Sequence, residues 1–299
     1  MESCSYTFAS CNVWILLTEL EKVTDAVHAK GSFIFLQLWA LGRVASPAVL
    51  KQEGGFDVVA PSPIRVSGVT LPGDEAVVPR ELTVAEIKEY VQLYTRAARN
   101  AIEAGFDGVE LHGANGYLLD QFLQSVSNNR TDEYGGSIEN RLRFPLEVVN
   151  AVVEAVGAER TAIRVSPWSK FQGKKYYVVY PDSQLKLFSV EMGMEEPLPT
   201  FTGFVECIRD AHPNFAYIHV VNEIQYSEAD PIPNGTDSND ALREAWGDRP
   251  YIAAGGFDRD SASSTVEKHG GMIAFGRHFI ANVSALFIPR VQTNLTITS

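Results

Sequence analysis

The segment from His112 to Tyr117 carries the densest set of side chains able to do chemistry. His112 and Asn115 lie three residues apart after a predicted strand, so both could direct hydrogen-bond donors at one carbonyl oxygen, as electrophilic stabilisers do. Tyr117 adds a phenolic hydroxyl that could donate a proton. The alternative is that His112 and Asn115 only satisfy the backbone groups of a loop. For this segment taken alone, the structural interpretation is at least as well supported as the catalytic one.

Four further sites end or follow predicted strands: Gln37, Arg164, Gly255-Gly256 and Gly276-Arg277. Arg164 lies in an otherwise apolar strand, so its charge needs an anionic or carbonyl partner in a pocket, or an ion pair with Glu110. Glycines after the last strands of a barrel often hold phosphate on backbone N–H groups, and Arg277 could add a bidentate contact. Each signal also has a plain structural explanation, namely a satisfied amide or an ordinary turn. Their shared position at strand ends favours a functional site.

The elements that must position these side chains alternate along the chain. Helices are predicted from the capping box Thr83-Val84-Ala85-Glu86 to Gly105, from Ser137, over residues 200–211 and over residues 241–246. Short β-rich apolar runs predict six strands, at residues 33–38, 108–111, 162–165, 217–221, 251–254 and 272–275. Strands separated by helices indicate a parallel α/β sheet, and their even spacing favours a barrel whose strand ends converge on one face.

Composition narrows the function classes. The 299 residues are 45% hydrophobic and carry a formal net charge of −12, which argues against disorder and against a nucleic-acid partner. Three cysteines cannot build a disulfide framework, and no Cys/His cluster suggests a metal site. The apolar run at residues 13–17 is too short for a signal peptide or membrane span. We therefore expect a cytoplasmic protein with no membrane partner.

The chain resembles the Old Yellow Enzyme family of FMN-dependent ene-reductases, most closely its fungal members. The order and spacing of the motifs agree over roughly residues 20–282, and the long central motif is highly specific. The matching segments are Gln37-Leu38-Trp39, His112 to Tyr117, Asn129 to Arg141, Arg164-Val165-Ser166-Pro167 and Phe275-Gly276-Arg277.

The resemblance implies a TIM (β/α)8 barrel in which NADPH or NADH reduces FMN, which then reduces the C=C bond of an α,β-unsaturated carbonyl substrate, an enone or enal. It implies that His112 and Asn115 hold the substrate carbonyl oxygen while Tyr117 protonates the α-carbon. The remaining implied contacts are with the cofactor: Gln37 and Arg164 at the flavin ring, and Gly256, Gly276 and Arg277 at the phosphate.

The chain departs from the family pattern in three places. Residues 1–19 and 283–299 are atypical ends, and residues 174–191 form an insertion that we interpret as a retained intron or a true lid insertion. The first two βα units have no counterpart, which leaves six of eight expected strands in one domain, residues 1–299. Such a barrel would expose two strand edges unless another chain or a rearranged N-terminus covers them.

Three functions are therefore weighed. The first is an FMN-dependent reductase, and the second is a truncated, catalytically inactive relative that does not retain FMN. The third, a flavin-free barrel lyase or isomerase, lacks a strand-end lysine or a carboxylate cluster for a metal. The sequence leaves the physiological substrate and the oligomeric state open.

Overall fold

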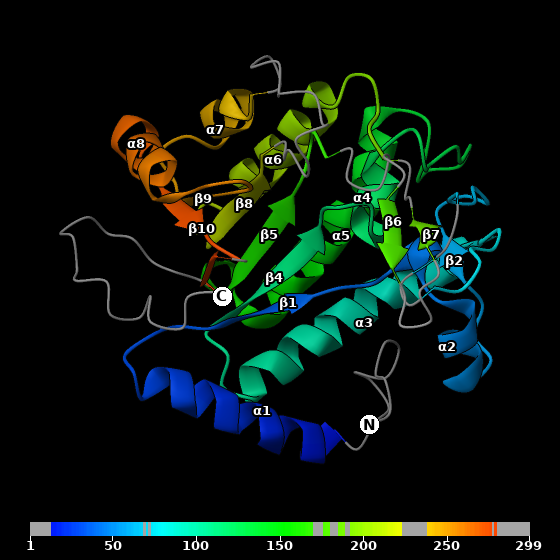
Figure 1. The fold of residues 1–299 in the computed structure, drawn as a ribbon, viewed down its shortest axis with the longest axis horizontal. Coiled ribbons are helices and arrows are strands. Elements are labelled where there is room, and N and C mark those ends of the chain that lie inside the picture. Colours follow the sequence, from blue (N-terminus) through cyan, green and yellow to red (C-terminus); the bar gives the residue numbers. More distant parts are fainter. Residues whose placement is uncertain are drawn as a thin grey trace.

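A single parallel sheet of six strands forms the centre of the molecule (Figure 1). The computed structural model describes residues 13–67, 70, 73–169, 176–179, 185–188, 192–222, 238–276 and 278–279. The sheet order is β1-β4-β5-β8-β9-β10. These strands are β1 (Phe35–Leu38), β4 (Gly108–Gly113), β5 (Thr161–Val165), β8 (Tyr217–Val221), β9 (Tyr251–Ala254) and β10 (Met272–Ala274). All six strands predicted from the sequence are thus confirmed, with bounds that shift by two residues at most.

Every neighbouring pair of strands in this sheet is parallel, so all six carboxyl ends point the same way. The first and last strands, β1 and β10, are its two edges, and among the described residues the sheet is therefore not closed. This agrees with the expectation of six strands from a (β/α)8 barrel.

The helices pack on one face of the sheet and on each other. In Figure 1, α1 (Val13–His28) lies alongside α3 (Val84–Glu103), and α3 contacts β1 and β4. The helix α5 (Ile138–Val156) contacts β4 and β5 and is followed around the sheet by α6 (Leu198–Ala211) and α7 (Asp240–Trp246), while α8 (Arg259–His269) contacts β10.

Local sequence signals explain where the two longest helices begin. The Thr83 side chain accepts a hydrogen bond from the Glu86 N–H, and the Glu86 carboxylate accepts one from the Thr83 N–H, which completes the predicted capping box of α3. Ser137 caps α5 in the same way through the Asn140 N–H. The apolar faces of both helices then enter the main core, where Ile87 and Phe144 are fully buried.

Short elements fill the long connections at the carboxyl ends of the strands. They are η1 (Gly42–Val44), α2 (Pro47–Gln52), β2 (Val59–Ala60), β3 (Arg80–Glu81) and α4 (Leu118–Leu123), with η2 (Ala158–Arg160) preceding β5. The six residues of α4 are all buried, although the sequence does not predict a helix there.

The predicted insertion at residues 174–191 contains an antiparallel hairpin. Its strands β6 (Tyr176–Val179) and β7 (Leu185–Phe188) pair with each other, and the other residues of this insertion lie outside the described residues. The atypical end at residues 283–299 also lies outside them, whereas α1 begins within residues 1–19.

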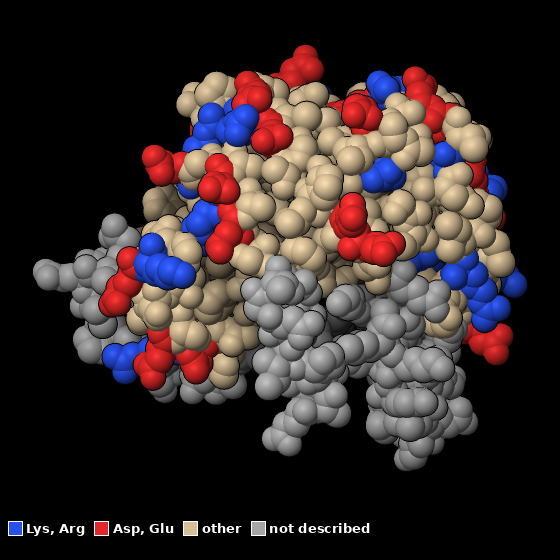
Figure 2. All heavy atoms as spheres, turned by 90° about the horizontal axis from the view of Figure 1, so that it is seen from above, with Lys and Arg blue, Asp and Glu red and all other residues tan. Residues whose placement is uncertain are grey.

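The surface carries charges of both signs. On the face in Figure 2, acidic and basic side chains are interspersed over the described part of the chain. None of the helices in the described ranges has the length and apolar character needed to cross a membrane.

Candidate functional site

Polar side chains from four neighbouring strands meet on the sheet. Gln37 of β1 is paired in register with Glu110 of β4. On the other side of β4, His112 is paired with Arg164 of β5, which is paired in turn with His219 of β8. Paired residues of a parallel sheet project on the same side of the sheet, so the fold brings these side chains together. The first and last of them, Gln37 and His219, are 182 positions apart in the chain.

The Glu110 carboxylate is the centre of this group. It is 7% exposed, and it accepts a hydrogen bond of 2.7 Å from Gln37 Nε2, while His219 Nδ1 lies 3.0 Å from its other oxygen. Burial alone would raise the pKa of Glu110. The charge and hydrogen bond of His219, the hydrogen bond of Gln37 and the charge of Arg164 outweigh burial and hold this pKa at about 2. Glu110 is therefore ionised at neutral pH.

His112 is also buried, and it is neutral. Burial, followed by the positive charge of Arg164, lowers the pKa of His112 to about 3. Its Nδ1 atom is inaccessible to solvent and has no hydrogen-bond partner among the described residues. A neutral imidazole with a spare nitrogen can hydrogen-bond a ligand without carrying charge into the site.

The rings of Trp39, His112 and Tyr117 lie close together. The Tyr117 ring centre lies 5.2 Å from that of His112 and 4.7 Å from that of Trp39, which it meets edge to face. Tyr117 is buried, whereas Trp39 is 52% exposed. The structure thus brings together two residues that the sequence proposed for substrate chemistry, and it adds Trp39, which lies two residues after Gln37.

Asn115 lies on a strained turn between β4 and α4. Its φ of 56° is in the left-handed region, where no other described residue except glycine is found, and Gly116 follows at 76°. The Asn115 N–H donates to Ser166 Oγ at 2.7 Å, and the Gly116 N–H donates to Asp120 Oδ2 at 2.8 Å. The turn is therefore fixed from β5 on one side and from α4 on the other.

The glycines predicted to hold phosphate follow the two strands at the opposite edge of the sheet, β9 and β10. Gly256 follows β9 and Gly276 follows β10, and these strands pair with each other. A Cβ atom built on either glycine would meet nothing within 4 Å, so the backbone there faces open space. Arg277, the third predicted phosphate contact, lies outside the described residues.

The sequence does not predict a functional role for two residues of this site, Glu110 and His219. Glu110 was considered only as an ion-pair partner for Arg164, and its described ion pair is with His219. A signal was available in both cases, because each is a polar residue inside an otherwise apolar strand. The same observation singled out Arg164.

The described residues fit a flavin mononucleotide. Arg164 is half-buried beside the polar side chains of the neighbouring strands. The buried nitrogens His112 Nδ1 and His219 Nε2 have no hydrogen-bond partner among the described residues. The backbone at Gly256 and Gly276 is open. Such a set offers a cation and hydrogen-bonding atoms to a polar ring at one end and backbone N–H groups to a phosphate at the other. No group of three potential metal ligands occurs in the described ranges.

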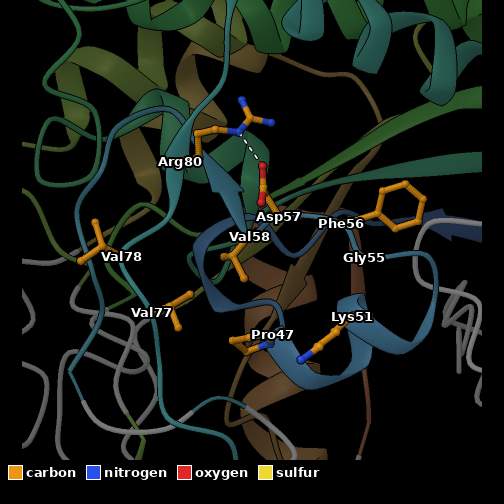
Figure 3. A pocket seen from close by; sticks show the side chains of 9 residues that line it. All are labelled: Pro47, Lys51, Gly55, Phe56, Asp57, Val58, Val77, Val78 and Arg80. Atoms are coloured by element: carbon orange, nitrogen blue, oxygen red, sulfur yellow. Dashed lines mark hydrogen bonds and ion pairs between the residues drawn. The ribbon is translucent and has the colours of Figure 1, made fainter.

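The one cavity described in detail lies elsewhere. It has a volume of about 480 Å³ and is lined by residues of α2, β3 and their flanks, including Lys51, Phe56 and Val78 (Figure 3). The Arg80–Asp57 ion pair closes one side of it. None of the predicted site residues lines this cavity.

Comparisons with known proteins agree with the geometry. The chain matches the sequence model of the NADH:flavin oxidoreductase / NADH oxidase family over residues 15–297. It is 44% identical over 280 residues to a chanoclavine-I aldehyde reductase of Penicillium roqueforti (strain FM164), with 92% of this chain and 68% of that protein covered. It is 43% identical over 272 residues to a probable inactive dehydrogenase of Claviceps purpurea, with 88% of this chain and 64% of that protein covered.

Solved structures show the same fold. Morphinone reductase in complex with tetrahydroNAD superposes with a TM-score of 0.71 at 35% identity, over 89% of this chain and 67% of that one. An old yellow enzyme homologue from Zymomonas mobilis gives a TM-score of 0.75 at 28% identity, over 94% of this chain and 76% of that one. The chain spans about two thirds of the length of the curated relatives that it matches.

Proposed function

The chain belongs to the NADH:flavin oxidoreductase / NADH oxidase family, and from that premise we propose that it is an FMN-dependent reductase of α,β-unsaturated carbonyl compounds. The observation that carries the proposal is the adjacency of His112 and Tyr117, with ring centres 5.2 Å apart, beside the half-buried charge of Arg164. This places a hydrogen-bonding imidazole next to a phenolic proton donor, as reduction of a polarised alkene requires.

Five residues would hold the cofactor: Gln37, Arg164, Gly256, Gly276 and Arg277. When bound, FMN supplies hydride transfer, taking hydride from NADPH or NADH and delivering it to the β-carbon of the substrate. Arg164 supplies a permanent positive charge on the inner side of the sheet, where it favours negative charge on a bound ring. The open backbone at Gly256 and Gly276 leaves room for a phosphate.

Substrate binding is assigned to His112 and Asn115. Because His112 is neutral, it holds the carbonyl oxygen through a hydrogen bond rather than through a full charge. The hydrogen bonds of the Asn115 and Gly116 N–H groups hold the backbone of this turn in place, so the entropic cost of ordering the backbone of Asn115 is met during folding. Together the two side chains stabilise negative charge that develops on the oxygen.

Tyr117 is assigned as the proton donor to the α-carbon. Its hydroxyl belongs to a buried side chain packed against His112 and the edge of Trp39, which limits competing proton transfer from water. Trp39 is exposed on the same side and would form part of the wall around the substrate.

The proposal is tested with the purified chain. We expect a yellow protein after incubation with FMN, and bleaching of its visible spectrum when NADPH is added without oxygen. Tyr117→Phe should then slow alkene reduction about 100-fold or more while sparing flavin reduction by NADPH. Tyr94→Phe is the matched control, because it removes a buried hydroxyl from helix α3, away from the strand ends. Equal slowing of both half-reactions in Tyr117→Phe would refute its role.

A second candidate is a relative of these enzymes that does not retain FMN. Two observations favour it: the sheet has open edges at β1 and β10 in its described part, and relatives at 43% identity carry the name probable inactive dehydrogenase or reductase. A chain that folds but stays colourless after incubation with FMN would establish this candidate and reject the first.

A further inference from the structure

A buried carboxylate stands at the centre of the site without a role in the chemistry proposed above. Glu110 lies on β4, and it contacts Gln37 on the neighbouring strand β1 and His219 on β8. The order β4-β5-β8 means that the contact with His219 passes across β5 on the inner side of the sheet. One carboxylate therefore ties three strands together at the level of the site.

The chemistry of a carboxylate determines how its two partners are oriented. An ionised carboxylate only accepts hydrogen bonds, so the Gln37 amide must turn its NH2 group toward Glu110 and its carbonyl oxygen away. For the same reason Nδ1 of His219 must carry the proton in its 3.0 Å contact with Glu110. Glu110 thus selects one of two amide orientations at Gln37 and one ring nitrogen at His219.

The orientations of Gln37 and His219 determine which of their polar atoms can hydrogen-bond a ligand. His219 is 9% exposed, and its Nε2 atom is buried with no hydrogen-bond partner among the described residues. A buried polar atom left without a partner costs free energy unless a ligand or water satisfies it. The remaining atom of the Gln37 amide that can accept a hydrogen bond is its oxygen, at the exposed edge strand β1.

We propose that Glu110 is a positioning residue, which fixes the hydrogen-bonding atoms that Gln37 and His219 offer to the bound cofactor, and that His219 Nε2 is a cofactor-binding atom. The identity of the ligand as FMN rests on the proposed function, whereas the orientation of the two side chains does not. A positioning role needs the reach of the glutamate side chain as well as its charge. The two requirements can be separated by substitution.

Two substitutions and one control make that separation. Glu110→Gln keeps the shape and removes the charge, so it offers an NH2 group to one of the donors it faces, which include Gln37 and His219. Glu110→Asp keeps the charge and shortens the side chain by one methylene, so it no longer spans from Gln37 to His219. Glu103→Gln is the control, because Glu103 is an exposed glutamate at the last residue of α3.

The first measurement uses the unliganded wild-type chain. Nitrogen-15 NMR of the histidine rings, with the His219 signal identified by its loss in His219→Gln, reports which ring nitrogen carries a proton. We expect Nδ1 of His219 to be protonated. An unprotonated Nδ1 would overturn the proposal whether or not the chain binds FMN.

The second measurement is the dissociation constant of FMN, followed by quenching of flavin fluorescence. We expect it to rise about tenfold in both Glu110→Gln and Glu110→Asp, as the loss of one or two oriented hydrogen bonds predicts, and to stay unchanged in Glu103→Gln. If Glu110→Asp binds FMN as the wild type does, charge alone is sufficient and the positioning role is wrong. If the wild type itself binds no FMN, the proposed function fails, and the NMR result still decides the orientation.

Discussion

Asp120 should make the stability of this protein fall as pH rises. It is fully buried on α4, where its carboxylate accepts hydrogen bonds of 2.8 Å from the Gly116 N–H and 2.9 Å from Gln124 Nε2. Burial raises the pKa of Asp120 to about 7, and the hydrogen bonds from Gln124 and Gly116 and the charge of Arg43 offset only part of this effect. The unfolded chain has the ordinary aspartate pKa of 3.8.

The sign and size of the effect follow from proton linkage. Between pH 4 and pH 7 the folded state holds a proton on Asp120 that the unfolded state releases, so the free energy of unfolding decreases as pH rises through this window. The slope approaches 1.36 kcal/mol per pH unit. From pH 5 to pH 8 this amounts to about 2.5 kcal/mol, because the titration is nearly complete once pH passes 7.

Asp120→Asn removes the titrating group and tests this reasoning. The variant should be the less stable protein at pH 5, because the asparagine NH2 then faces the NH2 of Gln124, whose oxygen is engaged by the Gly193 and Met194 N–H groups. Its stability relative to wild type should improve by about 2.5 kcal/mol between pH 5 and pH 8.

Urea unfolding at the two pH values, followed by circular dichroism, measures the difference. Asp25→Asn, at an exposed position of α1, is the control and should show no such shift. A difference between Asp120→Asn and wild type that is the same at pH 5 and pH 8 would show that Asp120 is not the titrating group.

Two smaller predictions concern groups remote from the site. Tyr94→Phe should stabilise the fold by about 1 kcal/mol in urea unfolding, because Tyr94 Oη is buried with no described partner; a loss of stability would mean that the hydroxyl is satisfied. Thr83→Ala should cost about 1 kcal/mol, since it removes the acceptor for the Glu86 N–H, and Thr83→Ser should retain most of the stability; equal losses in both would exclude the cap as the cause.

The positions of the strands and the longest helices could be predicted from the sequence because their signals are local. The alternation of apolar residues and the capping box at Thr83 lie within a few residues of the elements that they define. The resemblance of the motif from Asn129 to Arg141 added the family. The helix α4 could not be predicted in this way, since its buried residues include the polar side chains of Asp120 and Gln121, and the buried Gln124 follows directly.

Gln121 and Gln124 are buried because they hydrogen-bond distant segments, whereas Asp120 hydrogen-bonds Gly116 and Gln124 nearby. Gln121 accepts a hydrogen bond from the Arg43 N–H and donates to the oxygens of Leu41 and Gly116, and Gln124 accepts from the backbone after the insertion. Helical periodicity assigns polar residues to the solvent side and contains no information about loops 69 or more positions away. A periodic pattern therefore assigns Asp120 and Gln121, which hydrogen-bond the backbone of Gly116, to the wrong side of the helix.

By itself the sequence determined the α/β class, the six strands and the family, together with a set of residues able to bind a carbonyl oxygen and donate a proton. Only the tertiary structure decided which groups act on one another. The contact between Glu110 and His219 spans 109 positions and depends on the strand order β4-β5-β8, which pairing between distant strands creates. Burial in that sheet makes His112 neutral, whereas the neighbours His219, Gln37 and Arg164 keep Glu110 ionised against burial. The energy of a charge depends on its solvation and its neighbours rather than on its residue type.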